Sequence, residues 1–366
     1  MGFFSSRKLS PIGVEIGCRA IKMAQMEYGE GPGRVVALAQ HPLPLAESPD
    51  ERMKAIRNGM AGLLRGGGFK GREVVFGLNA QQLFIQNVRL PRLPDDEMAK
   101  VVRWEAEERL PEDFGDAEVR HLVAGDVRNP TAAGEGSEVR REVILLACRR
   151  KELNELIELL DSLRLVPTAI DVPACALARI TQTFLRRKAD EQTSFLFIDM
   201  GVGMSTAVVT RGSEILLIKP LPMGGLSMDR LVARKLKLTL DEAALARRQW
   251  AADAGDSIDP VLARAVGEAV RSEVEALAGE LLMCIRYHSV TFRGNRIAKT
   301  VLLGGEGNPR FAEQLSSRID TPCDLGDPFT GLELSDRVTE QLKSSRPGQW
   351  AVVLGLCLRT ERAAAA

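Results

Sequence analysis

The sequence predicts an α/β protein made of two halves of the same design. In Phe195–Gly203 an apolar run ends on Asp199, and glycines and a second apolar run follow, which is typical of strand, tight turn and strand. Pro11–Ala24 repeats this order, with Glu15 in the place of the aspartate. A third apolar run, Thr300–Gly307, ends in a glycine turn. Because the two similar turns open the two halves of the chain, we infer a duplicated fold.

Each of the two turns combines a carboxylate with backbone that lacks a side chain. Gly17 follows Glu15, and Gly201 and Gly203 follow Asp199. Glycine lets backbone N–H groups come close to an anion, and carboxylate oxygens suit Mg²⁺. The pair of turns therefore predicts a site that holds the phosphates of a metal-bound nucleotide between the two halves.

Composition limits the other classes of function. The chain has 366 residues, enough for two or more domains, and Lys+Arg and Asp+Glu are both 49. A formal net charge of zero argues against a nucleic-acid protein. There is no run of about 18 apolar residues and no apolar signal-peptide stretch, so we expect a cytosolic protein. The six cysteines are scattered without a C-x-x-C, which favours free buried thiols.

The first half begins with strands and one helix. Met1–Ser10 is expected to be a loose tail, and 12–40 to form strands around a glycine-rich turn. Ser48–Glu51 is a capping box that opens a helix. The glycines of Arg65–Gly68 end this helix; they are not a phosphate loop, since such a loop follows a strand. Val74–Leu78 is the next buried strand.

The middle and the second half alternate strands with amphipathic helices. The middle strands are expected over Leu83–Leu90, Val119–Val127 and Val143–Cys148, with helices over Asp95–Arg109 and Lys151–Leu163 and a low-complexity loop over Asn129–Ser137. After the turn at Asp199, helices are expected over Ser227–Lys237, from a capping box at Thr239 through Trp250, and over Val261–Val290, Arg310–Ile319 and Gln349–Arg359.

An ordered set of short motifs lies between the turns and after the last of them. They are Val88–Pro91, an acidic helix ending at Leu110-Pro111, Ile170–Val172, Met223–Gly225 and Ala351–Arg359. Together with the turns, this set resembles the type IV pilus assembly protein PilM family, in the FtsA/PilM branch of the actin-like ATPase superfamily. The resemblance implies an actin-like (duplicated ribonuclease H-like) two-lobed α/β fold, with a small inserted α/β subdomain in the first half.

The resemblance also implies boundaries. A tail over 1–10 would precede a first lobe over 11–193, with the inserted subdomain at about 80–166 and a linking helix over Ala169–Phe184. The second lobe would span 194–345, with a helical insertion at about 227–297. The last segment, 346–366, would be a helix that packs back on the first lobe.

ATP and Mg²⁺ are the cofactors that the resemblance implies. Asp199 would hold the metal ion, directly or through water. Eight residues would line the phosphates: Glu15, Gly17, Cys18, Lys22, Gly201, Gly203, Ser205 and Thr206. Gly304, Gly305 and Gly307 would lie behind the adenosine, and Arg247 would stand where the family has a residue that contacts ribose and base.

Several of these positions depart from the family's pattern. The family has Asp at 15 and Ser or Thr at 18, where this chain has Glu15 and Cys18. Ala244 and Arg247 replace a Glu and a Lys, and Glu306 stands where small residues are common. We therefore expect weak binding of ATP and little or no hydrolysis. No residue is identified as a base that activates water, and none of the three histidines lies in a phosphate turn.

The resulting hypothesis is a cytoplasmic scaffold of type IV pilus or related type II secretion assembly, with ATP as a conformational clamp. The resemblance implies that it binds the cytoplasmic N-terminal tail of a PilN-like inner-membrane protein, in a groove beside the inserted subdomain. It would contact other inner-membrane or motor components and reach the membrane only indirectly; homo-oligomers are left open. The alternatives are an FtsA-like filament-forming ATPase and an active phosphotransferase. Against the first, no amphipathic membrane helix is expected in Thr360–Ala366.

Overall fold

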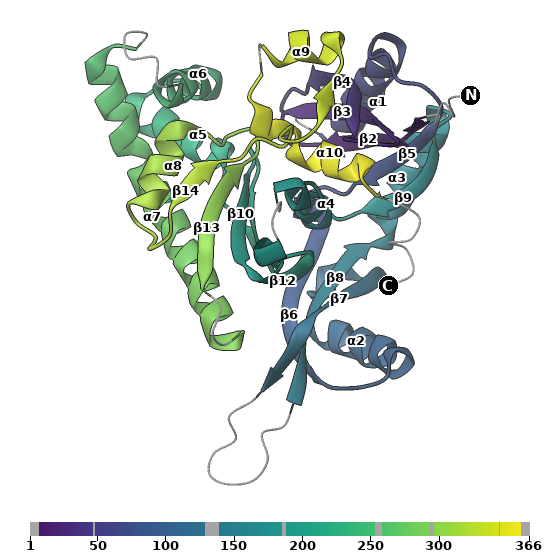
Figure 1. Cartoon of the computed structure of the whole chain (residues 1–366). Coiled ribbons are helices and arrows are strands. Elements are labelled where there is room, and N and C mark those ends of the chain that lie inside the picture. The colour runs from purple at the N-terminus through teal and green to yellow at the C-terminus, as the bar shows by residue number, and fades with distance from the viewer. Residues whose placement is uncertain are drawn as a thin grey trace.

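The computed structural model describes residues 7–46, 48–128, 139–184, 188–252, 258–292, 296–343 and 345–359. Within these ranges the chain forms two lobes, each built on its own sheet, and a third, smaller sheet. Figure 1 shows the second lobe on the left in green, the first lobe at the upper right in purple, and the small sheet below them.

The first-lobe sheet contains β1 (Lys8–Leu9), β2 (Ile12–Ile16), β3 (Ala20–Tyr28), β4 (Arg34–Pro42), β5 (Glu73–Gly77), β9 (Val166–Asp171) and β15 (Glu333–Leu334). Its order is β15-β4-β3-β2-β5-β9, and β1 pairs with the edge of β3. Strands β2, β3 and β4 are antiparallel, whereas β5 and β9 are parallel to β2. Lys8 and Leu9, expected in the loose tail, therefore belong to the sheet.

The second-lobe sheet repeats this design. It contains β10 (Ser194–Met200), β11 (Ser205–Arg211), β12 (Glu214–Leu221), β13 (Ile297–Leu303) and β14 (Cys323–Leu325), in the order β12-β11-β10-β13-β14. Three antiparallel strands are again followed by two strands parallel to the first. Strand β10 thus corresponds to β2, and β11 corresponds to β3. The predicted duplication is confirmed.

The third sheet belongs to a small subdomain, residues 83–149, which we call the insert. The insert lies between β5 and β9 in the sequence. It contains β6 (Leu83–Pro91), α2 (Asp95–Arg109), β7 (Ala117–Arg128) and β8 (Val139–Arg149), with strand order β6-β8-β7. Successive β8 residues point to opposite faces. Val143 and Leu145 pack with α2, whereas Ile144 and Leu146 join the main core. The expected loop Asn129–Ser137 lies outside the described residues.

Helix α3 (Arg150–Ser162) packs with the first lobe rather than with the insert. Its Leu156, Leu159 and Leu160 share a core with Ile56 of α1 (Pro49–Gly66) and with β2. Judged by what its residues pack against, the insert therefore ends at β8, whereas the expected boundary is at about residue 166. Helix α1 begins where the capping pattern placed it, since Ser48 Oγ accepts a hydrogen bond from Glu51 N at 3.3 Å.

Helices α4 (Pro173–Thr181) and α10 (Ala351–Cys357) pack against each other in the middle of the molecule. Helix α10, drawn in yellow in Figure 1, also contacts β2, β3 and β5, so residues 351–357 pack back on the first lobe. A Cβ atom added at Gly355 would lie 1.9 Å from the carbonyl oxygen of Ala176. The linking helix begins at Pro173, later than expected, because β9 continues to Asp171 and proline suits the first helical position.

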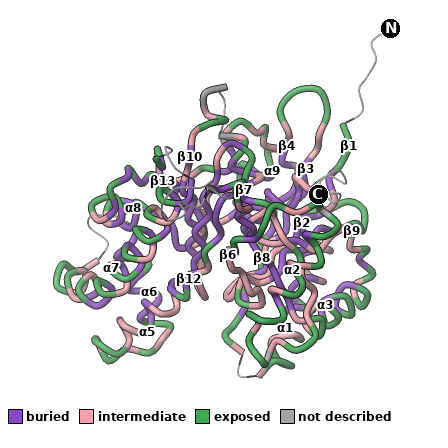
Figure 2. Tube along the Cα trace, turned by 90° about the horizontal axis from the view of Figure 1, so that it is seen from below, coloured by how far each residue is buried: buried purple, intermediate pink, exposed green. Residues whose placement is uncertain are grey.

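The remaining helices are α5 (Gly225–Leu236), α6 (Leu240–Ala251), α7 (Pro260–Thr291), α8 (Pro309–Ser316) and α9 (Asp336–Leu342), with short 3-10 turns over 80–82, 112–114, 182–184, 188–192 and 347–350. Helices α5 to α8 belong to the second lobe, and α9 packs on β4 of the first lobe. Figure 2 shows buried residues concentrated on the strands and exposed residues on the outer helices. All six cysteines are free. No described helix is both long and apolar enough to cross a bilayer.

Candidate functional site

A cleft of about 410 Å³ opens where the two lobes meet, at the ends of β2 and β10. Its walls include both predicted phosphate turns, and its far end includes part of the third turn. Eight of the predicted site residues line it: Glu15, Gly17, Cys18, Lys22, Asp199, Gly201, Gly203 and Gly305. The two turns nearly touch, since a Cβ atom added at Gly203 would lie 3.3 Å from Cys18 Cβ.

The two acidic residues occupy equivalent places in the two sheets. Glu15 lies opposite Lys22 on β3 and Gly77 on β5, and Asp199 lies opposite Thr206 on β11 and Leu303 on β13. Duplication of the fold therefore brings two carboxylates from distant parts of the sequence to the same cleft.

The surroundings of Asp199 favour its protonated form. Burial, followed by the negative charge of Glu15, raises its pKa to about 6, and Lys22 only partly opposes this. Gly304 has a φ of +88°, and a Cβ atom there would lie 2.6 Å from Asp199 Oδ1. The third turn must therefore have glycine where it passes the carboxylate. A bound cation would lower the pKa of Asp199, because it stabilises the ionised form.

Glu15 has one oxygen engaged and one free. Lys22 Nζ donates to Glu15 Oε1 at 2.8 Å, so this lysine neutralises the carboxylate within its own lobe. Glu15 Oε2 is buried and has no hydrogen-bond partner in the described part of the chain. An unpaired buried carboxylate oxygen is costly unless a ligand completes it.

Hydrogen bonds to backbone carbonyl oxygens hold the two turns in place. In the first turn, Arg52 of α1 donates to the carbonyl oxygens of Gly17 at 2.9 Å and Cys18 at 3.2 Å. In the second turn, the N–H groups of Gly225 and Leu226, at the start of α5, donate to the carbonyl oxygens of residues 201 and 202. Each turn is thus held by a helix of its own lobe.

Five of the predicted residues do not line the cleft: Ser205, Thr206, Arg247, Gly304 and Gly307. Ser205 is buried, and its Oγ donates to the carbonyl oxygen of Met223 at 2.8 Å, which ties β11 to the turn before α5. Thr206 is buried in the sheet. Gly304 and Gly307 shape the third turn, where Gly307 N donates to the Gly304 carbonyl at 3.3 Å. These residues support the cleft without facing it.

Arg247 lies in a buried ionic cluster behind the cleft. Its Nε is 2.6 Å from Asp229 Oδ1 of α5, and its Nη1 is 2.7 Å from Glu306 Oε2 of the third turn. All three side chains are almost fully buried. Both carboxylates raise the pKa of Arg247, against the effect of burial. Two of the sequence's departures, Arg247 and Glu306, are therefore partners of one another.

Sequence reasoning missed several polar residues that line the cleft: Arg19, Asn79, Gln81, Arg248, Ser345, Arg346 and Gln349. Arg248 is the residue after Arg247, and one helical position rotates a side chain by about 100°. Arg346 Nη1 is 3.5 Å from the Gly305 carbonyl oxygen. Arg19 Nη2 pairs with Asp241 Oδ1 of α6 at 2.9 Å, which joins the two lobes across the mouth of the cleft.

The residues present suit a magnesium-bound nucleotide. No cluster of three or more metal-ligating side chains occurs in the ranges that the structure describes. Mg²⁺ in nucleotide sites is held by one or two carboxylates together with phosphates and water, so a full protein cage is not required. Asp199 and the free oxygen of Glu15 would supply the carboxylates, and Arg19, Arg248 and Arg346 would supply positive charge for phosphates.

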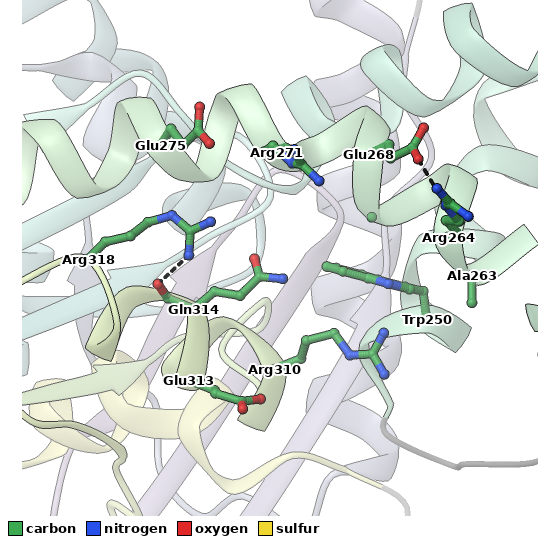
Figure 3. A pocket seen from close by; sticks show the side chains of 11 residues that line it. Trp250, Ala263, Arg264, Glu268, Arg271, Glu275, Arg310, Glu313, Gln314 and Arg318 are labelled. Atoms are coloured by element: carbon green, nitrogen blue, oxygen red, sulfur yellow. Dashed lines mark hydrogen bonds and ion pairs between the residues drawn. The ribbon is translucent and has the colours of Figure 1, made fainter.

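A larger cavity, of about 690 Å³, lies on the second lobe between α7 and α8 (Figure 3). Charged side chains of both signs line it, and Arg264 Nε pairs with Glu268 Oε1 at 3.2 Å. The Arg310 guanidinium lies over the Trp250 ring, and its Cζ atom is 4.9 Å from the centroid of the ring. None of the glycine turns lines this cavity. We interpret it as a solvated groove between two helices.

Two equivalent sheets, a nucleotide-sized cleft between them and an acidic residue at the end of each first strand define a protein of the actin-like class. The chain belongs to the type IV pilus assembly protein PilM family, whose model matches residues 13–361.

Solved structures have the same fold. A structure of the PilM–PilN type IV pilus biogenesis complex is 23% identical, covers 96% of this chain and 98% of that one, and has a TM-score of 0.77. The ethanolamine utilization protein EutJ from Carboxydothermus hydrogenoformans is 12% identical, with coverages of 96% and 89% and a TM-score of 0.53.

Proposed function

We propose that this chain is a cytoplasmic scaffold of type IV pilus or type II secretion assembly in which Mg²⁺–ATP clamps the two lobes together. Membership of the PilM family supports the assembly role. The observation that carries the clamp is the pair of carboxylates, Glu15 and Asp199, at equivalent strand ends on opposite walls of one cleft. A ligand that engages both walls stabilises the closed arrangement, because binding favours the state that it contacts best.

In this proposal Asp199 would hold the metal ion, which would neutralise part of the phosphate charge, and the protein would orient the phosphates. The N–H groups of Gly17 and Gly201 close the two turns on the carbonyl oxygens of Ala20 at 2.8 Å and Met204 at 3.2 Å. The N–H groups of Cys18 and Gly203, which line the cleft, would therefore approach the phosphates, and Gly305 would lie beside the nucleoside. Arg248 and Arg346, rather than Arg247, line the cleft and would supply positive charge to the nucleotide.

Little or no hydrolysis is part of the proposal. A base that activates water needs an acceptor atom within hydrogen-bond reach of that water. Among the described residues that line the cleft we identify no such base, since Glu15 pairs with Lys22 at 2.8 Å and Asp199 is assigned to the metal ion. We therefore expect binding without rapid turnover.

The proposed partner is the cytoplasmic tail of a PilN-like inner-membrane protein, and this is what would hold the chain at the membrane. Support comes from the solved PilM–PilN complex, whose PilM chain has the same fold. The tail would lie as an extended peptide between the first lobe and the insert, where main-chain hydrogen bonds give affinity and side-chain pockets give specificity. Other pilus components and further copies of the chain are candidate contacts.

The first test is calorimetric titration with ATP and Mg²⁺, with phosphate release measured in parallel. We expect micromolar-range binding that Asp199→Ala weakens at least tenfold, and negligible phosphate release. Asp324→Ala is the matched control, since Asp324 lies in the same lobe but pairs with Lys299 outside the cleft. Absence of heat at millimolar ATP would reject the clamp, and rapid phosphate release would reject the scaffold in favour of an enzyme.

A further inference from the structure

The insert belongs to the first lobe by sequence but packs against the second lobe. Strands β6, β7 and β8 all contact β12. Ala124, Val127, Ile144 and Leu146 belong to the large buried core that contains β10, β11 and β12 and that also reaches β3 and β4 of the first lobe. To the separate core that contains β2 and α1, the described part of the insert contributes Leu83 and Cys148, at the ends of its strands.

A buried carboxylate anchors this contact. Glu142 of β8 is fully buried, and Arg89 Nε of β6 donates to its Oε2 at 2.9 Å. Tyr287 of α7, in the second lobe, donates its hydroxyl to Glu142 Oε1. A buried charge is tolerated only when it is paired and hydrogen-bonded, and one of these bonds comes from the other lobe. Glu142 therefore favours a docked insert.

Two further hydrogen bonds cross the same boundary. Arg89 Nη2 donates to Thr291 Oγ1 of α7 at 2.9 Å, and Asn87 Nδ2 donates to the Leu216 carbonyl oxygen of β12 at 3.3 Å. Thr291 is buried as well. We call Asn87, Arg89, Glu142, Tyr287 and Thr291 the latch.

A cavity lies between the insert and α3 of the first lobe, lined by Phe114 and Arg149 on one side and by Asn154 and Glu158 on the other. We propose that the latch makes the insert move as one body with the second lobe, so that closing the nucleotide cleft changes this groove. This rests on the proposed function, because the partner tail would lie between the insert and the first lobe. Packed elements move as rigid bodies about a few connecting residues. Here the connections are the strand ends near Leu83 and Cys148. Nucleotide and partner tail would then alter each other's affinity reciprocally.

The motion can be measured without any ligand. Spin labels attached to a ketone-bearing amino acid at Arg57 of α1, Glu108 of α2 and Ser272 of α7 leave the native cysteines untouched; all three positions are exposed. We expect a narrow distance distribution between positions 108 and 272 and a broader one between 108 and 57. Glu142→Gln with Tyr287→Phe should broaden the first distribution. A first distribution broader than the second, or one unaffected by the double variant, would overturn the proposal.

The coupling is measured by titrating a synthetic peptide of the partner's cytoplasmic tail with and without Mg²⁺–ATP. We expect ATP to change the peptide's Kd about fivefold or more in the original chain, and less than twofold in Tyr287→Phe. Tyr28→Phe is the control, since Tyr28 is the other tyrosine and donates to the Cys357 carbonyl oxygen, away from the insert. Coupling that survives in Tyr287→Phe would contradict the latch. If the original chain binds neither ligand, the proposed function fails, while the ligand-free distances still decide the latch.

Discussion

At the scale of single residues, Asp199 combines a proposed role as metal ligand with an environment that disfavours its ionised form. Burial and the charge of Glu15 raise its pKa to about 6, within two units of neutrality. A metal ion binds the ionised carboxylate, so protonation competes with binding. Burial makes the ionised form of Asp199 unfavourable when no cation is bound. The same burial strengthens the attraction between this carboxylate and a bound cation.

This competition gives a pH dependence. Below about pH 6 the affinity for Mg²⁺–ATP should fall by up to about tenfold per pH unit, since a proton must leave Asp199 before the metal ion binds. Above that pH the ionisation of Asp199 should no longer change the affinity for Mg²⁺–ATP. Calorimetry between pH 5 and 8 measures it. ATP itself titrates in this range, so Asp199→Asn serves as the reference, and an equal slope in this variant would refute the assignment.

Arg247 carries a stability prediction. Replacing it by methionine leaves Asp229 and Glu306 buried without their shared partner, which should lower the free energy of unfolding by about 3–5 kcal/mol. Denaturant unfolding measures this loss. Arg264→Met is the control, because Arg264 is an exposed residue that pairs with Glu268, and it should cost less than about 1 kcal/mol. Similar losses in the two variants would contradict the cluster's role.

The site residues that the sequence revealed are those that are close together along the chain. Asp199 and Glu15 were found because strand, acid and glycine are adjacent. Arg247 and Glu306 could each be recognised as unusual, yet their pairing could not be predicted, since 59 positions separate them and only the packing of α6 against the third turn joins them. Arg248 was missed because the exact rotation of a helix is not determined by its amphipathic pattern alone.

At the scale of elements, α4 and α10 cross closely at Gly355. Gly355→Ala should destabilise the protein by about 1–3 kcal/mol or more, because the added methyl group overlaps the backbone of Ala176 and must push the helices apart. Thermal unfolding measures the loss. Gly279→Ala is the control on α7, where nothing lies within 4 Å of the added atom. There the change should stabilise by about 0.5–1 kcal/mol. Stabilisation by both changes would refute this packing argument.

Most elements could be predicted from local signals. Capping residues marked the starts of α1 and α6, and Thr239 forms the full capping box with Glu242. The pairing of β1 with β3 could not be predicted, because two residues carry no usable period. The start of α4 was placed too early, because apolar residues in a buried strand and in a buried helix have no distinguishing pattern.

At the scale of the whole molecule, the predicted actin-like fold is confirmed, and its basis is the repeated sheet order. The repeat was detectable because both copies keep the turn that lines the cleft. Which lobe the insert packs against was not detectable, since Glu142, Tyr287 and Thr291 come from different lobes and nothing in their local sequence links them. Distances between lobes are properties of tertiary packing, and one sequence contains no direct record of them.

The position of α10 also has a consequence for biosynthesis. Helix α10 completes the core beneath β2 and β5, although more than 270 residues separate it from β5 along the chain. The ribosome therefore releases the strands of the first lobe long before the helix that covers them. Until α10 is synthesised, one apolar face of these strands stays exposed to water. By that stage the strands and helices of the second lobe have all been synthesised. We infer that the first lobe, although it is synthesised first, completes its fold after the second lobe.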